Sequence, residues 1–147
     1  MPLAALLCLV VAISDGDTLK ARCGEAGAYE QVTVRLAEIV APEKAQPFGQ
    51  RSKAHLSMLC FGAWATIRTE TVDRYRRTVA RVECRGKYAN AEQVRAGMAW
   101  AYTKYQRDKT FPQLQAEAQG RRAGLWADRE PVAPWEWREA RRDKQPQ

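Results

Sequence analysis

The sequence predicts a mainly β fold with helices: one small closed barrel of five strands, accompanied by three α-helices. Short segments of alternating apolar residues recur between turns rich in Gly, Pro and Asp, in the order β-β-β-α-β-β-α-α. The 147 residues are a length typical of one domain. Five short strands interrupted by a helix are typical of a barrel of the oligonucleotide-binding type.

The strands are predicted from the alternation and from the turns between them. The apolar run at residues 2–13 is too short to span a bilayer, and no positively charged segment precedes it. We therefore interpret residues 7–13 as a buried first strand and expect no membrane association. Alternatively, the residues before this strand are the remnant of an export signal that starts upstream. The other strands are expected at residues 18–23, 31–36, 63–69 and 78–84.

Helices are predicted at residues 48–60, 90–100 and 111–124. Asn90 is suited to cap the second helix, with Gln93 three residues later. The only histidine, His55, lies in the first helix and is interpreted as structural. A single histidine excludes most zinc sites and most Ser-His-Asp or Cys-His triads. Catalysis therefore has to use carboxylates, Arg, Lys, Tyr or a hard metal.

Four cysteines predict two disulfides. A hairpin centred on Asp15-Gly16 pairs residues whose numbers sum to 31, so it places Cys8 opposite Cys23, at a distance where a disulfide can form. Strict alternation makes this a hydrogen-bonded pair, which is the less favoured site for a disulfide, so a bulge in the hairpin would help the bridge to form. Two buried free thiols are the alternative. Cys60 and Cys84 would then form the second bridge, from a helix end to a strand. Two bridges imply an oxidising compartment, so we expect a periplasmic or secreted protein.

The charge distribution favours an anionic partner. The formal net charge is +7, and the positive excess is concentrated in residues 51–100. Nucleic acid is the first candidate for the partner and a membrane surface the second. Residues 1–50 are net acidic, and several of their carboxylates are candidates for binding a cation.

The last part of the chain is expected to lie outside the barrel. We assign residues 1–126 to the barrel domain and residues 127–147 to a C-terminal extension. Trp135 and Trp137 are expected to dock on the domain, because leaving them in water is unfavourable. Residues 138–147 are charged, and either a mobile solvated end or a nucleic-acid contact fits them.

Four motifs follow one another along the chain: Ser14-Asp15-Gly16-Asp17-Thr18, Val34-Arg35-Leu36 with Ala41-Pro42-Glu43, Asp73-Arg74-Tyr75-Arg76-Arg77, and Asn90 with Val94-Arg95-Ala96-Gly97. In order and spacing, from about residue 8 to 126, they resemble the staphylococcal nuclease family. Residues 134–138 resemble the ending of its bacterial, usually exported, members. The resemblance implies the barrel with three helices and calcium-dependent hydrolysis of DNA and RNA phosphodiesters. We expect a monomer.

The resemblance also implies the roles of individual residues. Asp17 and the backbone carbonyl of Ala41 match metal ligands for Ca²⁺, and a carboxylate after a tight turn suits a hard cation. Glu43 matches the residue that contacts the metal through water and is proposed as the general base. Arg35 and Arg77 match the phosphate-binding arginines, because a guanidinium can donate two parallel hydrogen bonds to one phosphate.

The basic turn is expected to extend the binding surface. Tyr75 and Tyr105 match stacking or phosphate contacts of the family, with packing as the alternative. Arg74 and Arg76 are expected to contribute to nucleic-acid binding beside them.

Two residues depart from the family pattern. Val40 stands where the family has an aspartate that binds the metal directly, and valine has no oxygen to offer. Glu38 cannot replace that aspartate, because two residues along an extended chain displace it by roughly 6.6 Å. Arg76 stands where the family usually has glycine, so we expect it to resist a positive φ and to disturb Arg77.

Three functions remain open from the sequence. The first is a metal-dependent nuclease weakened by Val40. The second is a nucleic-acid-binding barrel that has lost catalysis. The third is a basic secreted protein with a structural or protein-binding role, and the retention of Asp17, Arg35, Glu43 and Arg77 argues against it.

Overall fold

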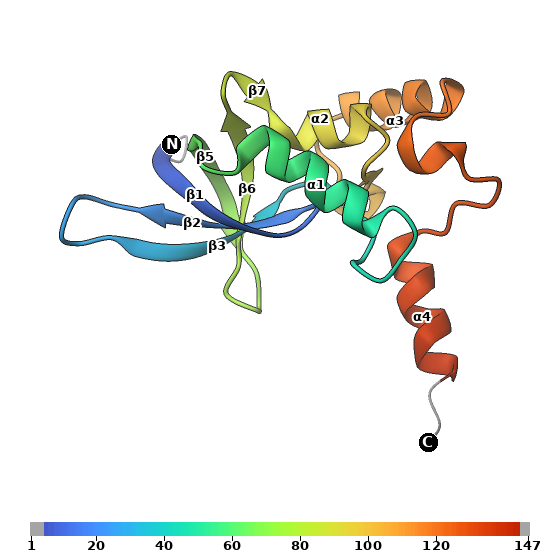
Figure 1. Cartoon of the computed structure of the whole chain (residues 1–147), viewed down its shortest axis with the longest axis horizontal. Coiled ribbons are helices and arrows are strands. Elements are labelled where there is room, and N and C mark those ends of the chain that lie inside the picture. Colours follow the sequence, from blue (N-terminus) through green and yellow to red (C-terminus); the bar gives the residue numbers. More distant parts are fainter. Residues whose placement is uncertain (1–4, 145–147) are drawn as a thin grey trace.

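A closed five-stranded barrel forms the centre of the computed structural model, which describes residues 5–144 (Figure 1). Its strands lie in the order β3-β2-β1-β5-β6 with antiparallel neighbours, and parallel pairing of residues 34–36 with 78–80 joins β3 to β6 and closes the barrel. The predicted fold class is confirmed. The strands are β1 (Ala5–Asp15), β2 (Thr18–Cys23), β3 (Glu30–Leu36), β5 (Trp64–Val72) and β6 (Thr78–Cys84).

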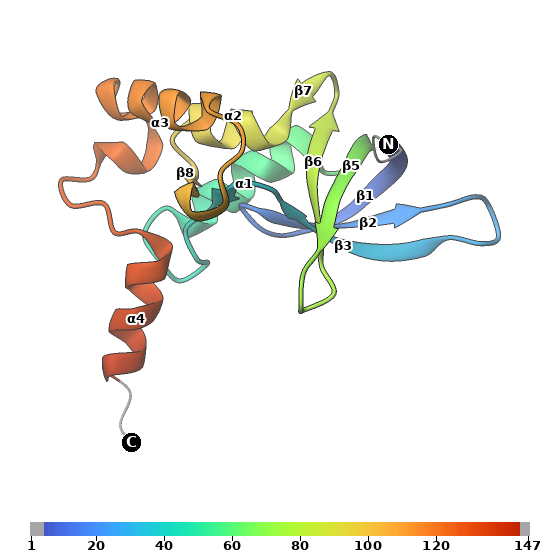
Figure 2. The same cartoon turned by 180° about the vertical axis from the view of Figure 1, so that it is seen from behind.

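The helices gather on one side of the barrel, and the β2–β3 hairpin extends away on the other side (Figures 1 and 2). Short strands β4 (Ile39–Val40) and β8 (Trp100–Ala101) pair with each other, and β7 (Lys87–Tyr88) pairs with the end of β6. Two 3₁₀ turns are η1 (Thr103–Tyr105) and η2 (Gly124–Ala127). Among the described residues there are four α-helices: α1 (Gly49–Cys60), α2 (Ala89–Arg95), α3 (Thr110–Gly120) and α4 (Pro134–Lys144). The predicted number of three helices is therefore wrong.

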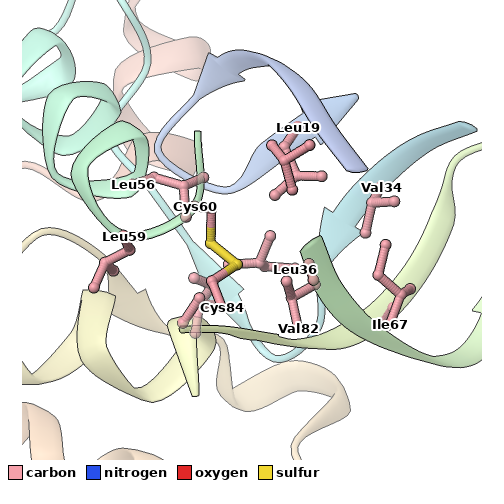
Figure 3. Close-up of a cluster of buried hydrophobic side chains, with 14 of the residues drawn as sticks. Leu19, Val34, Leu36, Leu56, Leu59, Cys60, Ile67, Val82 and Cys84 are labelled. Atoms are coloured by element: carbon pink, nitrogen blue, oxygen red, sulfur yellow. A yellow bond between two sulfur atoms is a disulfide. The ribbon is translucent and has the colours of Figure 1, made fainter. Parts of the chain in front are cut away.

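The core lies between the barrel wall and the helices α1, α2 and α3. Alternate residues of the strands point into it, and the last turn of α1 covers one end (Figure 3). Burial of each large aliphatic side chain contributes about 1.5–3 kcal/mol. The fully buried side chains include Leu19, Val34, Leu36, Leu56, Ile67, Val82 and Phe111.

Two buried amides connect the helices to the barrel. The side chain of Asn90 donates to the carbonyls of Ala37 and Ala80 and accepts the N–H of Val82, so it fastens α2 to β6. Asn90 is therefore not the predicted helix cap, because its amide is engaged with buried backbone groups of Ala37, Ala80 and Val82. Gln93 contacts His55 Nδ1 and donates to the carbonyl of Gly16 at the β1–β2 turn.

Helices α2 and α3 both end earlier than predicted, by five and four residues. After α2 the chain turns at Gly97, where φ is 71°, and passes close to the segment after α3. A Cβ atom at Gly97 would lie 2.1 Å from the carbonyl oxygen of Ala123, and one at Gly124 would lie 2.3 Å from that of Gly97. The chain has to turn after each helix to bring Gly97 and Gly124 into this close contact. Neither α2 nor α3 can therefore continue to its predicted end.

Residues 134–144 of the C-terminal extension form the helix α4. Pro134 opens α4 at a position where a helix needs no N–H donor. Trp135 packs against Trp100 and Tyr102, with ring centroids 5.7 and 6.0 Å apart. The helix then projects away from the body beyond α1 (Figure 2). No helix within residues 5–144 is long and apolar enough to cross a bilayer.

Both predicted disulfides are present, Cys8–Cys23 and Cys60–Cys84. The predicted turn is nevertheless displaced by one residue: Asp15 pairs with Thr18, so Gly16 and Asp17 form the turn. Two register shifts in β1, between Val10 and Ala12 and between Ile13 and Asp15, then bring Cys8 opposite Cys23. The correct cysteine pairing thus depends on bulges that offset the error at the turn.

Each disulfide is expected to contribute about 3 kcal/mol to the free energy of unfolding, because the bridges close loops of 15 and 24 residues. Urea unfolding of Cys8→Ala/Cys23→Ala and of Cys60→Ala/Cys84→Ala measures both contributions. Peptide mapping of the non-reduced protein checks the connectivity. Four free thiols, or a peptide that joins Cys8 to Cys84, would contradict it.

Candidate active site

One cavity of about 770 Å³ collects most of the predicted site residues. It opens where the β1–β2 turn, the end of β3, the segment after β4 and the β5–β6 turn meet, and the first turns of α4 form another wall. Predicted residues that line it are Asp17, Arg35, Val40, Ala41, Glu43, Arg74, Tyr75 and Arg77. Further lining residues are Asp15, Pro42, Asp73, Tyr102, Lys104, Pro134, Trp135 and Arg138.

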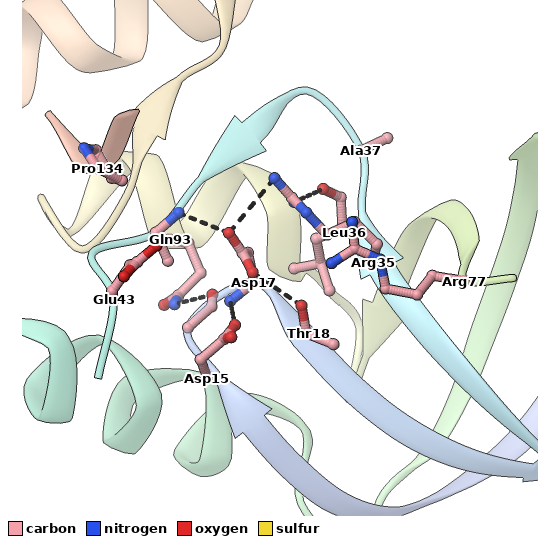
Figure 4. Close-up of polar contacts among 12 residues, drawn as sticks. Asp15, Asp17, Thr18, Arg35, Leu36, Ala37, Glu43, Arg77, Gln93 and Pro134 are labelled. Atoms are coloured by element: carbon pink, nitrogen blue, oxygen red, sulfur yellow. Dashed lines mark hydrogen bonds and ion pairs between the residues drawn. The ribbon is translucent and has the colours of Figure 1, made fainter. Parts of the chain in front are cut away.

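Asp17 joins three of these segments (Figure 4). Its carboxylate is buried, with Oδ2 2.8 Å from the Ala41 nitrogen and 3.5 Å from an Arg35 guanidinium nitrogen. Oδ1 accepts the hydroxyl of Thr18 at 2.9 Å. Burial opposes the charge, but the Arg35 guanidinium and the hydrogen bonds from Asp15, Ala41 and Thr18 outweigh it, so the pKa of Asp17 is lowered. Asp17 is therefore ionised at neutral pH.

Asp15 forms a second carboxylate next to the first. Its Oδ1 accepts the backbone N–H of Asp17 at 3.1 Å. Burial and the neighbouring charge of Asp17 raise the pKa of Asp15 to about 7. Below that pH the pair carries close to one negative charge rather than two.

Glu43 is held from two sides. Its backbone N–H donates to the side chain of Gln46 at 3.1 Å, and Oε1 lies 3.1 Å from Nε of Arg138 on α4. The arginine comes from the C-terminal extension, which sequence reasoning did not connect with Glu43. The Pro-Trp-Glu-Trp-Arg stretch was the available signal, but it indicated no role for Arg138.

The β5–β6 turn presents Arg77 and Tyr75. Asp73 Oδ1 accepts the backbone N–H groups of Tyr75 and Arg77, and Oδ2 lies 2.7 Å from Nε of Arg77. Tyr75 is 64% exposed, and the guanidinium carbons of Arg74 and Arg77 lie 5.0 and 5.5 Å from the centroid of its ring. Partial burial opposes ionisation of Asp73, but these hydrogen bonds and the guanidinium of Arg77 outweigh it and lower its pKa.

Arg76 adopts the left-handed conformation, with φ 64°, so the expectation that it resists positive φ is wrong. The surrounding hydrogen bonds of the turn offset a cost of about 1 kcal/mol for a residue with a Cβ. Arg77 keeps its contacts with Asp73, and the Arg76 side chain does not line the cavity. The side chain of Tyr105 lies outside the described residues, although its backbone forms the end of η1.

Three residues of the cavity wall, Asp17, Ala41 and Glu43, are the candidates to hold the expected cation, mostly through water. Asp17 is ionised and Oδ1 keeps a lone pair, and Glu43 and Ala41 contribute a carboxylate and a carbonyl to the same wall. Val40 is buried at the vacated position and offers no oxygen. Within residues 5–144, no group of three or more His, Cys, Asp or Glu side chains is arranged to hold a metal ion.

Comparison with known proteins identifies the protein family. Residues 33–128 match the family model described as staphylococcal nuclease homologue. The chain is 47% identical over 131 residues to a protein of Haemophilus influenzae named an uncharacterized endonuclease, covering 89% of this chain and 72% of that protein. It is 37% identical over 142 residues to a micrococcal nuclease of Shigella flexneri, covering 89% and 79% respectively. The chain therefore belongs to the staphylococcal nuclease family.

Proposed function

We propose that this chain is a calcium-dependent nuclease that hydrolyses phosphodiester bonds of DNA or RNA in the 770 Å³ cavity. The observation that carries the proposal is the convergence of Arg35 and Arg77 with Asp17 and Glu43 on one cavity. The names of the relatives, endonuclease and micrococcal nuclease, support it. The two disulfides favour an oxidising compartment, periplasmic or extracellular.

The residues divide the chemistry between them. Arg35 and Arg77 bind the phosphate and neutralise the charge that resists attack. Glu43 accepts a proton from water while the water oxygen bonds to phosphorus and one ester P–O bond breaks, and solvent protonates the leaving oxygen. Asp17, the Ala41 carbonyl and, through water, Glu43 would hold the calcium ion, which stabilises charge on the phosphate when bound.

A second function, nucleic-acid binding without cleavage, is favoured by one specific observation. Val40 removes a carboxylate from the cavity while both arginines stay in place. Carboxylate ligands set much of the affinity for calcium, so the proposed nuclease has weak calcium affinity and slow turnover. The third possibility, a purely structural role, gains no support from the cavity.

Replacing Val40 by aspartate separates the first two functions. Val40→Asp adds a carboxylate beside Ala41, so calcium-dependent cleavage of a plasmid is expected to rise at least about tenfold at low calcium. Val40→Asn is the matched control without charge and should gain little, and chelator should abolish cleavage in every variant.

Two outcomes contradict this site. If the natural protein already cleaves as fast as Val40→Asp at low calcium, a carboxylate at position 40 is not needed to bind calcium. If neither protein cleaves at any calcium concentration, the binding function replaces the nuclease.

Asp73 is expected to hold Arg77 for phosphate binding. Asp73→Asn keeps an acceptor for the two backbone N–H groups and removes the charge that faces Arg77, so kcat should fall on the order of tenfold, as for the loss of about 1.5 kcal/mol from one charge-assisted hydrogen bond. Steady-state kinetics on a defined oligonucleotide measure it, and an unchanged kcat would remove Asp73 from the site.

The same variant has a pH signature in stability. Because the pKa of Asp73 is lowered, its contribution is present above the ordinary value of 3.8 and is lost as pH falls through the lowered pKa. The difference in Tm between the natural protein and Asp73→Asn should therefore be largest near neutral pH and should shrink as pH falls below 3.8. Melting curves of both proteins across this pH range measure the difference in Tm. A difference that grows toward low pH would contradict the assigned role of Asp73.

A further inference from the structure

A second cavity continues the active-site cavity along α4. It measures about 390 Å³ and is lined by Glu43, Trp135, Arg138, Arg141 and Arg142. Three of these residues, Glu43, Trp135 and Arg138, also line the active-site cavity. The two hollows are therefore neighbours that meet at the Glu43–Arg138 ion pair.

Basic and acidic side chains lie on different faces of α4. Arg141 and Arg142 follow Arg138 by three and four residues, a spacing that places all three on one face. Trp135 lies one turn before Arg138 on the same face and stays 39% exposed despite packing against Trp100. The acidic residues of the helix, Glu136, Glu139 and Asp143, form a separate stripe by the same spacing.

Part of the positive charge on this face of α4 is not neutralised by acidic groups of the protein. Glu43 is paired with Arg138. Within the described part of the chain, neither Arg141 nor Arg142 forms a hydrogen bond or an ion pair. Both side chains are exposed, so the core does not require them. Two unpaired guanidinium groups in a hollow beside a phosphate-binding site match a polyanion that enters that site.

We infer that α4 binds the polynucleotide backbone beside the scissile bond, with Arg141 and Arg142 on the neighbouring phosphates and Trp135 against a base. The inference rests on the proposed function, because it continues the strand bound by Arg35 and Arg77. The helix from Trp135 to Arg142 extends about 10 Å, at 1.5 Å per residue, which leaves room for two phosphates of one strand. Arg138 fixes the helix to the catalytic wall through Glu43.

The test is calorimetric binding by the full chain in chelator, which prevents cleavage. Two probes are compared: a single-stranded DNA decamer, and a nucleoside 3′,5′-bisphosphate, which is too short to reach Arg141 and Arg142 from the active-site cavity. Arg141→Gln/Arg142→Gln should weaken decamer binding on the order of tenfold and reduce the slope of log K against log salt by about 1.4. Binding of the bisphosphate should be unchanged.

Two comparisons make the result specific. Arg121→Gln/Arg122→Gln removes the same charge just after α3, at residues that line neither cavity, and should leave decamer binding within about twofold of the natural protein. Arg141→Lys/Arg142→Lys should retain most of the affinity, because lysine also binds phosphate as a point charge.

The outcomes separate this inference from the proposed function. Decamer binding that is unchanged in Arg141→Gln/Arg142→Gln, or weakened equally in the α3 control, overturns the role of α4. Arg77→Ala should weaken both probes. If the natural protein binds neither probe in chelator, and does not bind the bisphosphate with calcium present, the proposed function fails and this inference fails with it.

Discussion

The buried carboxylate of Asp17 is the interaction on which the candidate site depends. It binds the N–H of Ala41, the hydroxyl of Thr18 and the guanidinium of Arg35, so it fixes the β1–β2 turn, β3 and the segment after β4 relative to one another. A buried charge is tolerable only with such partners. Arg35 has five N–H donors and uses only some of them for Asp17 and the Leu36 carbonyl. Other N–H groups of its guanidinium therefore remain for a phosphate. The same pair therefore joins these segments and orients Arg35 toward the cavity.

Two features around this carboxylate affect the charge of the cavity in the same direction. Val40 has no charge at the position where the resemblance leads us to expect an aspartate, and Arg138 brings a positive charge to Glu43. Both features favour an anion in the cavity over a cation. Under the proposed function, they lead us to expect weak calcium binding together with binding of nucleic acid, to which the basic face of α4 would add.

The sequence could predict what depends on local pattern. Alternation predicted the strands of the barrel, and the motifs predicted seven residues that the fold brings to one cavity, with Val40 beside them. Features decided by distant contacts could not be predicted. The early ends of α2 and α3 come from the approach of Gly97 to Gly124, and Asn90 serves strand atoms of the core rather than its own helix. Arg138 reaches Glu43 only because the C-terminal segment folds back as α4, and its charged composition did not indicate this.

The central claim is that the cavity bounded by Asp17, Arg35, Glu43 and Arg77 binds a phosphodiester. The most direct measurement is a crystal structure of the protein with calcium and a nucleoside 3′,5′-bisphosphate. The account predicts a phosphate within hydrogen-bond distance of both Arg35 and Arg77, on the side of the cavity that Asp17 and Glu43 face. A bisphosphate bound elsewhere on the molecule, with both arginines still paired only to Asp17 and Asp73, would contradict it.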